Sequence, residues 1–312
     1  MIASIDIGTN SVLLLIAEKS GDELRAVRDE ARITRLGEKL AATGVLADTA
    51  MERTLAVLRD YARICHEAGA QEIIALGTAA MRRAGNGSAF AARIEHELGF
   101  TVHIIPEEEE AQLTYAASAA AFGRDITVMD IGGGSTEFIF MNSQKGIHEN
   151  GIKAQSLELG VVTLTERFFT NDPVSSEELE AAQTFIRSFL HEKLDPAFFT
   201  NPAPSFIATA GTATSLVAMH LELEQFDAAR VHGARLTASD IDALIEKIAA
   251  LPVAQRLSLK GLQKGREDVI LAGALIMREA MRLLGYTEAT ISDRGVRWGV
   301  LYRAVMDEMR ST

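Results

Sequence analysis

The stretch that decides the fold is IDIGTNSVLLLI, from Ile5 to Ile16. A similar stretch, MDIGGGSTEFIF, runs from Met129 to Phe140, 124 residues further along the chain. Asp, Ile, Gly and Ser recur in register, and an apolar run typical of a strand follows each glycine turn. The sequence therefore predicts a duplicated β-hairpin, with strands at 2–7 and 12–18 in the first copy and at 126–131 and 137–141 in the second.

The composition of the two turns points to phosphate. Glycine lets backbone N–H groups converge on an anion, and neighbouring hydroxyls add donors. An Asp at the end of the preceding strand can hold a divalent cation beside that anion. A single glycine turn is explained well enough by hairpin geometry. Because hairpin geometry does not require the same acid and hydroxyl twice, the repeat favours a duplicated phosphate-binding fold.

Strands and helices alternate through the rest of the chain, which favours α/β layers in both halves with a ligand in the cleft between them. Further strands are expected at 72–76, 102–105 and 206–210. Capping-box pairs predict three helix starts. They are Thr49 with Glu52, for a helix that contains Cys65 and ends near Gly69; Ser175 with Glu178, for a helix to about Leu194; and Thr237 with Asp240, for a helix towards Leu251.

The acidic run from Glu107 to Glu110 has two interpretations. It suits a helix N-terminus, where Pro106 and acids are favoured. With about 3.6 residues per turn, the first two acids face away from the apolar stripe of Leu113, Ala116, Ala117 and Ala120. Glu109 and Glu110 flank that stripe, so either could reach a cleft and accept a proton from water.

Several basic side chains are candidates for phosphate contacts, although each can equally be a solvated surface charge. Arg82 and Arg83 end a strand-to-helix stretch, and the segment ATAGTATS from Ala208 to Ser215 places glycine and hydroxyls where a strand enters a helix. Near the C-terminus the candidates are Arg266, Arg294 and Arg297, while Trp298 is expected in the core.

Composition excludes several classes of protein. The net charge of −12 offers no general field for nucleic acid, and no run approaches the roughly 18 uncharged apolar residues of a membrane helix. The single Cys65 forms no internal disulfide, and the start of the chain lacks the features of a signal peptide. We expect a cytoplasmic protein without membrane or nucleic-acid partners. A homodimer is left open.

In order along the chain, IDIGTNSVLLLI, TAAMR, EEEEAQL, MDIGGGSTEFIF, LELGVVTLTERF, TAGTATSL and SDRGVRWGVLYR resemble the exopolyphosphatase and guanosine pentaphosphate phosphohydrolase family, in its short form. The resemblance spans nearly the whole chain. It implies two actin-like (ribonuclease H-like) domains, each a mixed sheet flanked by helices, with a cleft between them. We expect them at 1–122 and 123–312, with a C-terminal helix at about 299–312 able to pack back on the first.

The resemblance also assigns roles. It implies that Glu110 is the catalytic base, with Glu109 as the alternative, and that Arg82 is the arginine of the TxxLR motif. Mg²⁺ is the implied cofactor, associated with Asp130 and Glu137, and Asp6 is its candidate ligand in the first copy. The expected phosphate contacts are Gly8, Thr9, Asn10, Ser11, Gly132, Gly133, Gly134, Ser135, Thr136, Gly211, Thr212 and Arg266.

Two positions depart from the family pattern. Pro106 and Glu107 stand where Ser-Gly is usual before the acidic motif, and the usual GLREG reads GVRWG here. The hypothesis is hydrolysis of a terminal phosphoanhydride of inorganic polyphosphate or guanosine pentaphosphate, with water activated by a Glu. The alternatives are a kinase of the same fold and a nucleotide sensor without turnover.

Overall fold

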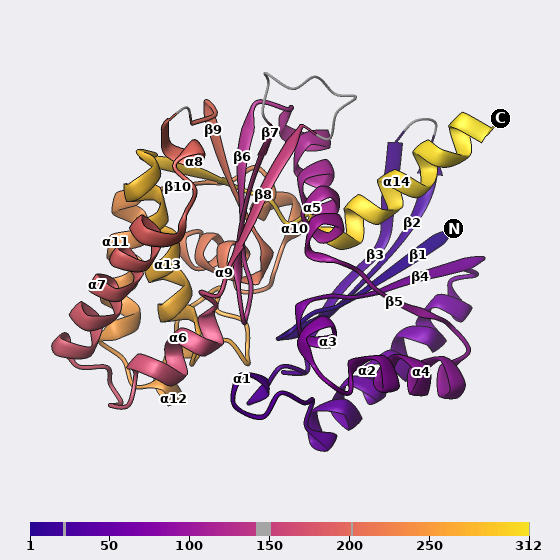
Figure 1. The fold of residues 1–312 in the computed structure, drawn as a ribbon, viewed down its shortest axis with the longest axis horizontal. Helices are drawn as coiled ribbons and strands as arrows, with labels where there is room; N and C mark the ends of the chain where they lie inside the picture. Colours follow the sequence, from indigo (N-terminus) through magenta and orange to yellow (C-terminus); the bar gives the residue numbers. More distant parts are fainter. Residues whose placement is uncertain (21–22, 142–150, 201, 312) are drawn as a thin grey trace. The chain divides into compact units, whose positions relative to one another are not determined.

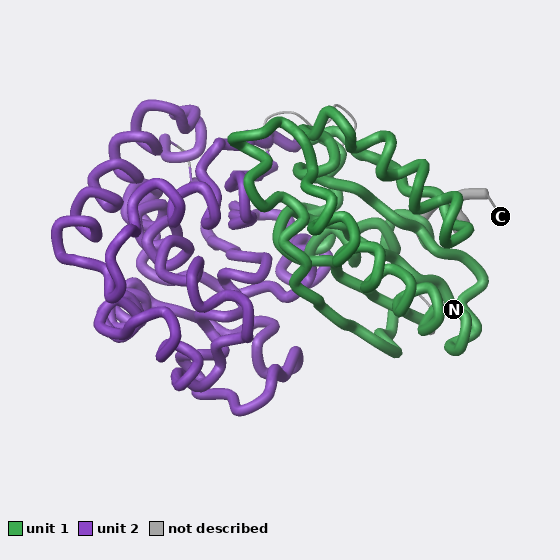
Figure 2. The backbone as a smooth tube through the Cα atoms, turned by 90° about the horizontal axis from the view of Figure 1, so that it is seen from below, with its two compact units in different colours: residues 1–117, 295–312 green, residues 118–294 purple. Residues whose placement is uncertain are grey.

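The computed structural model describes residues 1–20, 23–141, 151–200 and 202–311. The chain forms two compact units, shown in Figure 2: unit 1 comprises Met1–Ala117 and Gly295–Thr312, and unit 2 comprises Ser118–Arg294. The chain leaves unit 1 within helix α5 (Glu107–Phe122) and returns to it after Arg294. The expected domain ranges, 1–122 and 123–312, stay a prediction about folding units.

Unit 1 is built on a five-stranded mixed sheet in the order β3-β2-β1-β4-β5 (Figure 1). β1 pairs antiparallel with β2 and parallel with β4, so the first hairpin lies in the middle of the sheet. β3 and β5 are the edges. The strands are β1 (Ile2–Ile7), β2 (Ser11–Ser20), β3 (Glu23–Ile33), β4 (Glu72–Gly77) and β5 (Val102–Ile104).

Helices bury both faces of this sheet. On one face, Leu14 packs with Tyr61 and Phe90, while on the other Leu15 packs with Leu113 and Trp298. Alternate β2 residues thus meet different helices, because successive side chains of a strand point to opposite faces. The remaining helices of unit 1 are α1 (Leu40–Thr43), α2 (Asp48–Glu67), α3 (Ala79–Arg83), α4 (Gly87–Leu98) and α14 (Val296–Ser311).

Unit 2 repeats this strand order. Its six-stranded sheet runs β10-β11-β9-β6-β7-β8, so β8-β7-β6-β9-β11 repeats the unit 1 order and β10 is added at the edge. Asp6 faces Leu13 across the first hairpin, and Asp130 faces Glu137 at the same offset in the second. The strands are β6 (Ile126–Ile131), β7 (Thr136–Met141), β8 (Ile152–Leu157), β9 (Ser205–Thr209), β10 (Arg235–Thr237) and β11 (Glu288–Ile291).

One large apolar core holds unit 2 together. Phe138 and Leu157 from the sheet pack there with Ile186, Leu216 and Leu275 from three helices. No helix within the described ranges is long and apolar enough to span a bilayer. The helices are α6 (Val161–Phe168), α7 (Ser176–Lys193), α8 (Ala197–Thr200), α9 (Ala210–His220), α10 (Ala228–Val231), α11 (Ala238–Ala249), α12 (Val253–Arg256) and α13 (Ile270–Leu284).

The predicted hairpins and the expected α/β class with two mixed sheets are confirmed. Two of the three capping boxes are present: Ser175 and Thr237 each accept the amide of the residue three positions on. The third was wrong, because α2 begins at Asp48 after Ala47, which leaves Thr49 inside the helix. Ala116 and Ala120, predicted in the apolar stripe of α5, are exposed.

A loop after each third strand supports the glycine turn of its hairpin. In unit 1, the amides of Thr34 and Arg35 both donate to the Asn10 carbonyl at 3.0 Å. In unit 2, the Val161 amide donates to the Gly132 carbonyl at 3.1 Å, and the next amide donates to the Gly133 carbonyl at 2.9 Å. We call these two segments, residues 34–37 and 160–162, the braces. Each brace satisfies carbonyls of its turn.

Gly160 tests how closely the unit 2 brace must approach its turn. A Cβ at this position would lie 2.2 Å from the Gly133 carbonyl oxygen, so the brace must withdraw in Gly160→Ala. Overpacking of this kind is expected to lower the free energy of unfolding by about 1–3 kcal/mol. Urea denaturation measures it. Gly85→Ala is the control, since its Cβ would meet nothing closer than 3.7 Å. Equal stability of both variants would contradict a close-fitting brace.

Candidate active site

The two glycine turns have the same backbone geometry. The Gly8 amide donates to the Ser11 carbonyl at 3.0 Å, and the Gly132 amide donates to the Ser135 carbonyl at 2.9 Å. A Cβ on either glycine would lie at 3.0–3.1 Å from that same carbonyl oxygen, which is closer than a side chain tolerates well. The duplicated glycine therefore keeps both turns tight.

The tight turns leave backbone donors available. Among the hydrogen bonds of the described residues, none uses the amides of Thr9, Asn10, Gly133 or Gly134 as donors. The buried side-chain amide nitrogen of Asn10 also has no partner. Converging N–H groups of this kind form an anion-binding concavity. Each turn thus offers donors suited to a phosphate oxygen.

The hydroxyls of the second turn serve its own structure. Ser135 donates to the Glu137 carboxylate at 2.6 Å, and Ser156 on β8 donates to the same oxygen at 2.8 Å. The buried Thr136 hydroxyl donates to the Leu159 carbonyl at 2.5 Å. Asp130 lies opposite Glu137 in the β6–β7 ladder. Glu137 therefore holds the turn to β8 through the two serines.

The first turn lies beside a pair of carboxylates in unit 1. Burial, with the nearby Glu110 carboxylate as the second cause, raises the pKa of Asp6 to about 7. The Asp6 Oδ1 atom is buried and has no hydrogen-bond donor. Burial likewise raises the pKa of Glu110, against the opposing effect of Arg82. Two desolvated acids side by side are typical of functional sites.

Arg82 fixes the orientation of Glu110. Its Nη1 atom donates to Glu110 Oε2 at 2.8 Å and to the Ile105 carbonyl at 2.9 Å. Both side chains are largely buried, with 19% of Arg82 and 17% of Glu110 exposed. Arg82, expected as a phosphate contact, is thus placed on the carboxylate that is expected to be the base.

The other acids of the run are placed differently. Glu107 and Glu108 are exposed, whereas Glu109 and Glu110 are partly buried, as the helical periodicity predicted. Glu109 forms a 2.7 Å ion pair with Arg303 of α14. That pair engages Glu109. Glu110 is the acid of the run whose carboxylate interacts with Asp6.

The remaining phosphate candidates gather at the start of α9 in unit 2. Ala210 adopts φ of 66°, a left-handed conformation that costs energy in a residue with a side chain. A Cβ on Gly211 would lie 2.0 Å from Arg266 Nη2, so the guanidinium rests directly on this glycine. Burial lowers the pKa of Arg266 to about 10. Thr212 is buried, with its methyl group where a Cβ on Gly273 would be.

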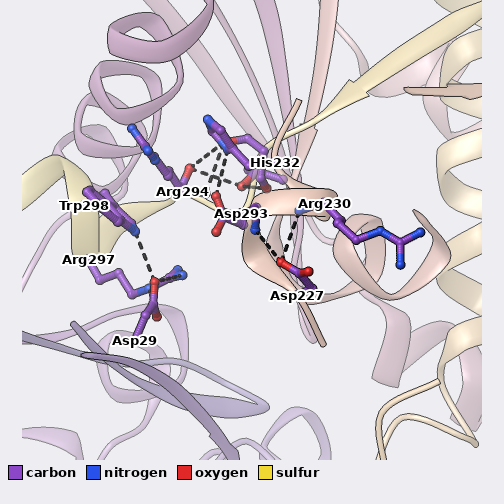
Figure 3. Close-up of polar contacts among 11 residues, drawn as sticks. Asp29, Asp227, Arg230, His232, Asp293, Arg294, Arg297 and Trp298 are labelled. Carbon is purple, nitrogen blue, oxygen red and sulfur yellow. Dashed lines mark hydrogen bonds and ion pairs between the residues drawn. The ribbon is translucent and has the colours of Figure 1, made fainter. Parts of the chain in front are cut away.

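The C-terminal arginines differ in their surroundings. Figure 3 shows the Arg297 side chain and the Trp298 indole both reaching Asp29 of β3. Arg297 makes two 2.9 Å bonds to that carboxylate, and Trp298 donates to it at 3.3 Å. These contacts fix the first turn of α14 on the sheet of unit 1. Trp298 is buried, as expected, and Arg294 lies in unit 2 with a half-buried side chain.

The donor set at the first turn fits Mg²⁺. Among the described residues there is no cluster of three or more His, Cys, Asp or Glu side chains able to cage a metal ion. Mg²⁺ is usually held through one or two carboxylates together with substrate phosphates and water. The partnerless Asp6 Oδ1 atom is a hard oxygen donor of this kind, whereas Glu137 is occupied by serines.

A family model for the Ppx/GppA phosphatase family matches residues 15–308. The chain belongs to this family. Exopolyphosphatase 2 of Mycobacterium tuberculosis is 33% identical to this Ppx/GppA member, over 96% of this chain and 97% of its own length. A crystal structure of the Aquifex aeolicus family member covers 98% of each chain at 32% identity, with a TM-score of 0.81. An exopolyphosphatase structure from Cytophaga hutchinsonii aligns with a TM-score of 0.87 at 27% identity. The actin-like fold expected from the motifs is thereby confirmed.

Sequence reasoning missed the parts of the site that support it. The unit 1 brace carries no motif, and LELGVVTLTERF, which contains the unit 2 brace, supported only the resemblance and was given no role. Gly37 and Gly160 mark the closest approaches: a Cβ there would lie 2.4 Å from Thr9 and 2.2 Å from Gly133. Arg303 was not singled out either, because a lone arginine on a C-terminal helix gives no signal of its partner. That Glu109 pairs with Arg303, far away in the sequence, is visible only in the fold.

The acid pair predicts a pH-dependent stability. The pKa of Asp6 in the folded protein exceeds its unfolded value of 3.8. The neutral carboxyl therefore contributes its full stability below pH 3.8, and this stability is lost as the pH rises through about 7. Asp6→Asn should therefore match the wild type near pH 4 and exceed its free energy of unfolding above pH 7, by about 2–4 kcal/mol. Denaturation at each pH measures this. Exposed Asp125 provides the control, Asp125→Asn; a pH-independent Asp6→Asn difference would contradict the assignment.

Proposed function

We propose that this Ppx/GppA protein is an exopolyphosphatase, which hydrolyses the terminal phosphoanhydride bond of inorganic polyphosphate and releases orthophosphate. The observation that carries the proposal is the buried Asp6 and Glu110 pair beside a turn with available amides. The exopolyphosphatase names of relatives from Mycobacterium and Cytophaga support it.

In this proposal Glu110 is the general base. Arg82 engages Oε2, which leaves Oε1 to accept a proton from the attacking water. Because burial raises the pKa of Glu110, the carboxylate is a stronger base than an exposed one. The proton moves from water to Glu110, the water oxygen bonds to the terminal phosphorus, and the bridging oxygen leaves with the shortened chain.

The turns supply electrostatic stabilisation. Charge on the outer oxygens of the transferred phosphoryl group is spread over fixed N–H donors, which need no reorganisation during the reaction. When bound, Mg²⁺ would neutralise further phosphate charge, with Asp6 as its protein ligand in unit 1 and Asp130 and Glu137 as the candidates in unit 2. Thr9, Asn10, Gly133 and Gly134 are the proposed amide donors. That both turns hold one phosphate chain stays a prediction.

Guanosine pentaphosphate is the second candidate substrate, because its terminal anhydride presents the same phosphate group and the family model includes both activities in its name. A panel of substrates decides between them. Tripolyphosphate, long-chain polyphosphate and guanosine pentaphosphate are each offered with Mg²⁺, and orthophosphate, chain length and nucleotide products are followed together. We expect orthophosphate with stepwise chain shortening, and loss of release after chelation by EDTA.

Two assays outside that panel could contradict the proposal. ADP formation from added ATP that depends on an added acceptor would indicate a kinase. Tight binding of guanosine tetraphosphate without any release of phosphate would indicate a sensor.

Glu110→Gln tests the base. Gln keeps an oxygen for Arg82 but cannot take a proton from water, so kcat should fall by about 10²–10⁴-fold while substrate binding is largely retained. Steady-state phosphate release and calorimetric binding of tripolyphosphate measure the two effects. Exposed Glu108 and ion-paired Glu109 provide matched controls, Glu108→Gln and Glu109→Gln, which should each change kcat less than about tenfold. Undiminished turnover in Glu110→Gln would remove this residue from the mechanism.

A further inference from the structure

Arg256 is the most deeply buried arginine among the described residues of unit 2, with 1% of its surface exposed. Burial lowers its pKa, against the opposing effect of Asp172 and Asp268, and among the described residues no carboxylate accepts a hydrogen bond from it. Its partners are backbone carbonyls instead. A buried cation that is hydrogen-bonded to no carboxylate is costly, so the bonds of Arg256 to backbone carbonyls are the contacts that compensate its burial.

The carbonyls that Arg256 joins come from two separate segments. Its Nε atom donates to the Ile248 and Leu251 carbonyls, both at 3.2 Å, at the end of α11. Its Nη1 atom donates to the Glu267 carbonyl at 2.9 Å. The first two bonds cap a helix. The third bond spans the segment between α12 and α13, and it fixes the backbone next to Arg266.

Arg266 is the buried cation that lies on the α9 turn. Its carbonyl accepts the amides of Val269 at 3.1 Å and Ile270 at 2.9 Å, where α13 begins. Its guanidinium rests on Gly211, where a Cβ would lie 2.0 Å away. A shift of the backbone at 266–267 would therefore move the guanidinium off the glycine.

We propose that Arg256 is a positioning residue for Arg266. It ties the Glu267 carbonyl to the end of α11 and so holds the Arg266 guanidinium on Gly211, where it is ready to contact a phosphate oxygen. This inference rests on the proposed function, because it takes Arg266 as a phosphate-binding residue. Arg256 itself is sealed from solvent and does not touch the substrate.

A double-mutant cycle tests the proposal. Arg266→Met should lower kcat/KM for tripolyphosphate by about ten- to a hundredfold, the loss expected for a charge-assisted hydrogen bond, and mainly through KM. Arg256→Met should lower kcat/KM about five- to thirtyfold in the wild type. In the Arg266→Met background it should have no further effect. A merely structural role would lower kcat/KM by the same factor in both backgrounds, which would overturn the proposal.

The controls separate positioning from loss of fold. Arg187 contacts α13 through Glu279 at 3.2 Å, away from the 263–269 segment, so Arg187→Met is an arginine deletion elsewhere in unit 2 that should leave KM unchanged. Arg256→Lys keeps the charge but cannot reach all three carbonyls, and it should give an intermediate KM with a higher melting temperature than Arg256→Met. A KM of Arg256→Lys equal to that of the wild type would count against the proposal.

Hydrogen–deuterium exchange gives a readout independent of turnover. Arg256→Met should accelerate amide exchange within residues 263–269 above the rest of unit 2, while Arg187→Met should not. Uniform acceleration throughout unit 2 would overturn the positioning role. If the wild type releases no phosphate from any substrate, the proposed function fails, and the exchange pattern still decides whether Arg256 orders the segment that carries Arg266.

Discussion

The hydrogen bond between the first and last residues of each glycine turn is the constraint on which the rest of the structure depends. It bends the backbone so sharply that the middle amides are left without internal acceptors. Backbone N–H groups need acceptors, and under the proposed function the phosphate oxygens would supply them. The braces satisfy carbonyls of the same turns, so the middle amides are the groups of each turn that are left without a partner among the described residues.

The buried ionisable groups resemble the turn amides, because their burial is not fully compensated inside the protein. Asp6 and Glu110 interact in unit 1, and in unit 2 Arg256 ends α12 while Arg266 precedes α13, each in surroundings that disfavour its charge. Structural ion pairs elsewhere, such as Arg187 with Glu279, remain partly exposed. Groups that are desolvated without full compensation have stronger interactions with a bound ion or phosphate, because the local dielectric is low.

The central hairpins were predictable because their strands are buried on both faces and their glycine turns repeat. The edge strands β3 and β8 were not, since residues such as Arg25 and Arg28 face solvent and interrupt any apolar alternation. Helical periodicity sorted the four acids of α5, yet it could not place Ala116 and Ala120, which are exposed. Contacts between residues distant in sequence, such as Arg82 with Glu110, depend on α3 and α5 converging and leave no local pattern.

Unit 2 is a continuous segment, whereas unit 1 is completed by α14 at the end of the chain. Trp298, Val300 and Leu301 of that helix cover Leu15 and Leu76 on one face of the first sheet. On the ribosome, that face must wait uncovered until all of unit 2 has been synthesised. The part of this apolar face that α14 covers is therefore exposed to chaperones for as long as unit 2 takes to be translated.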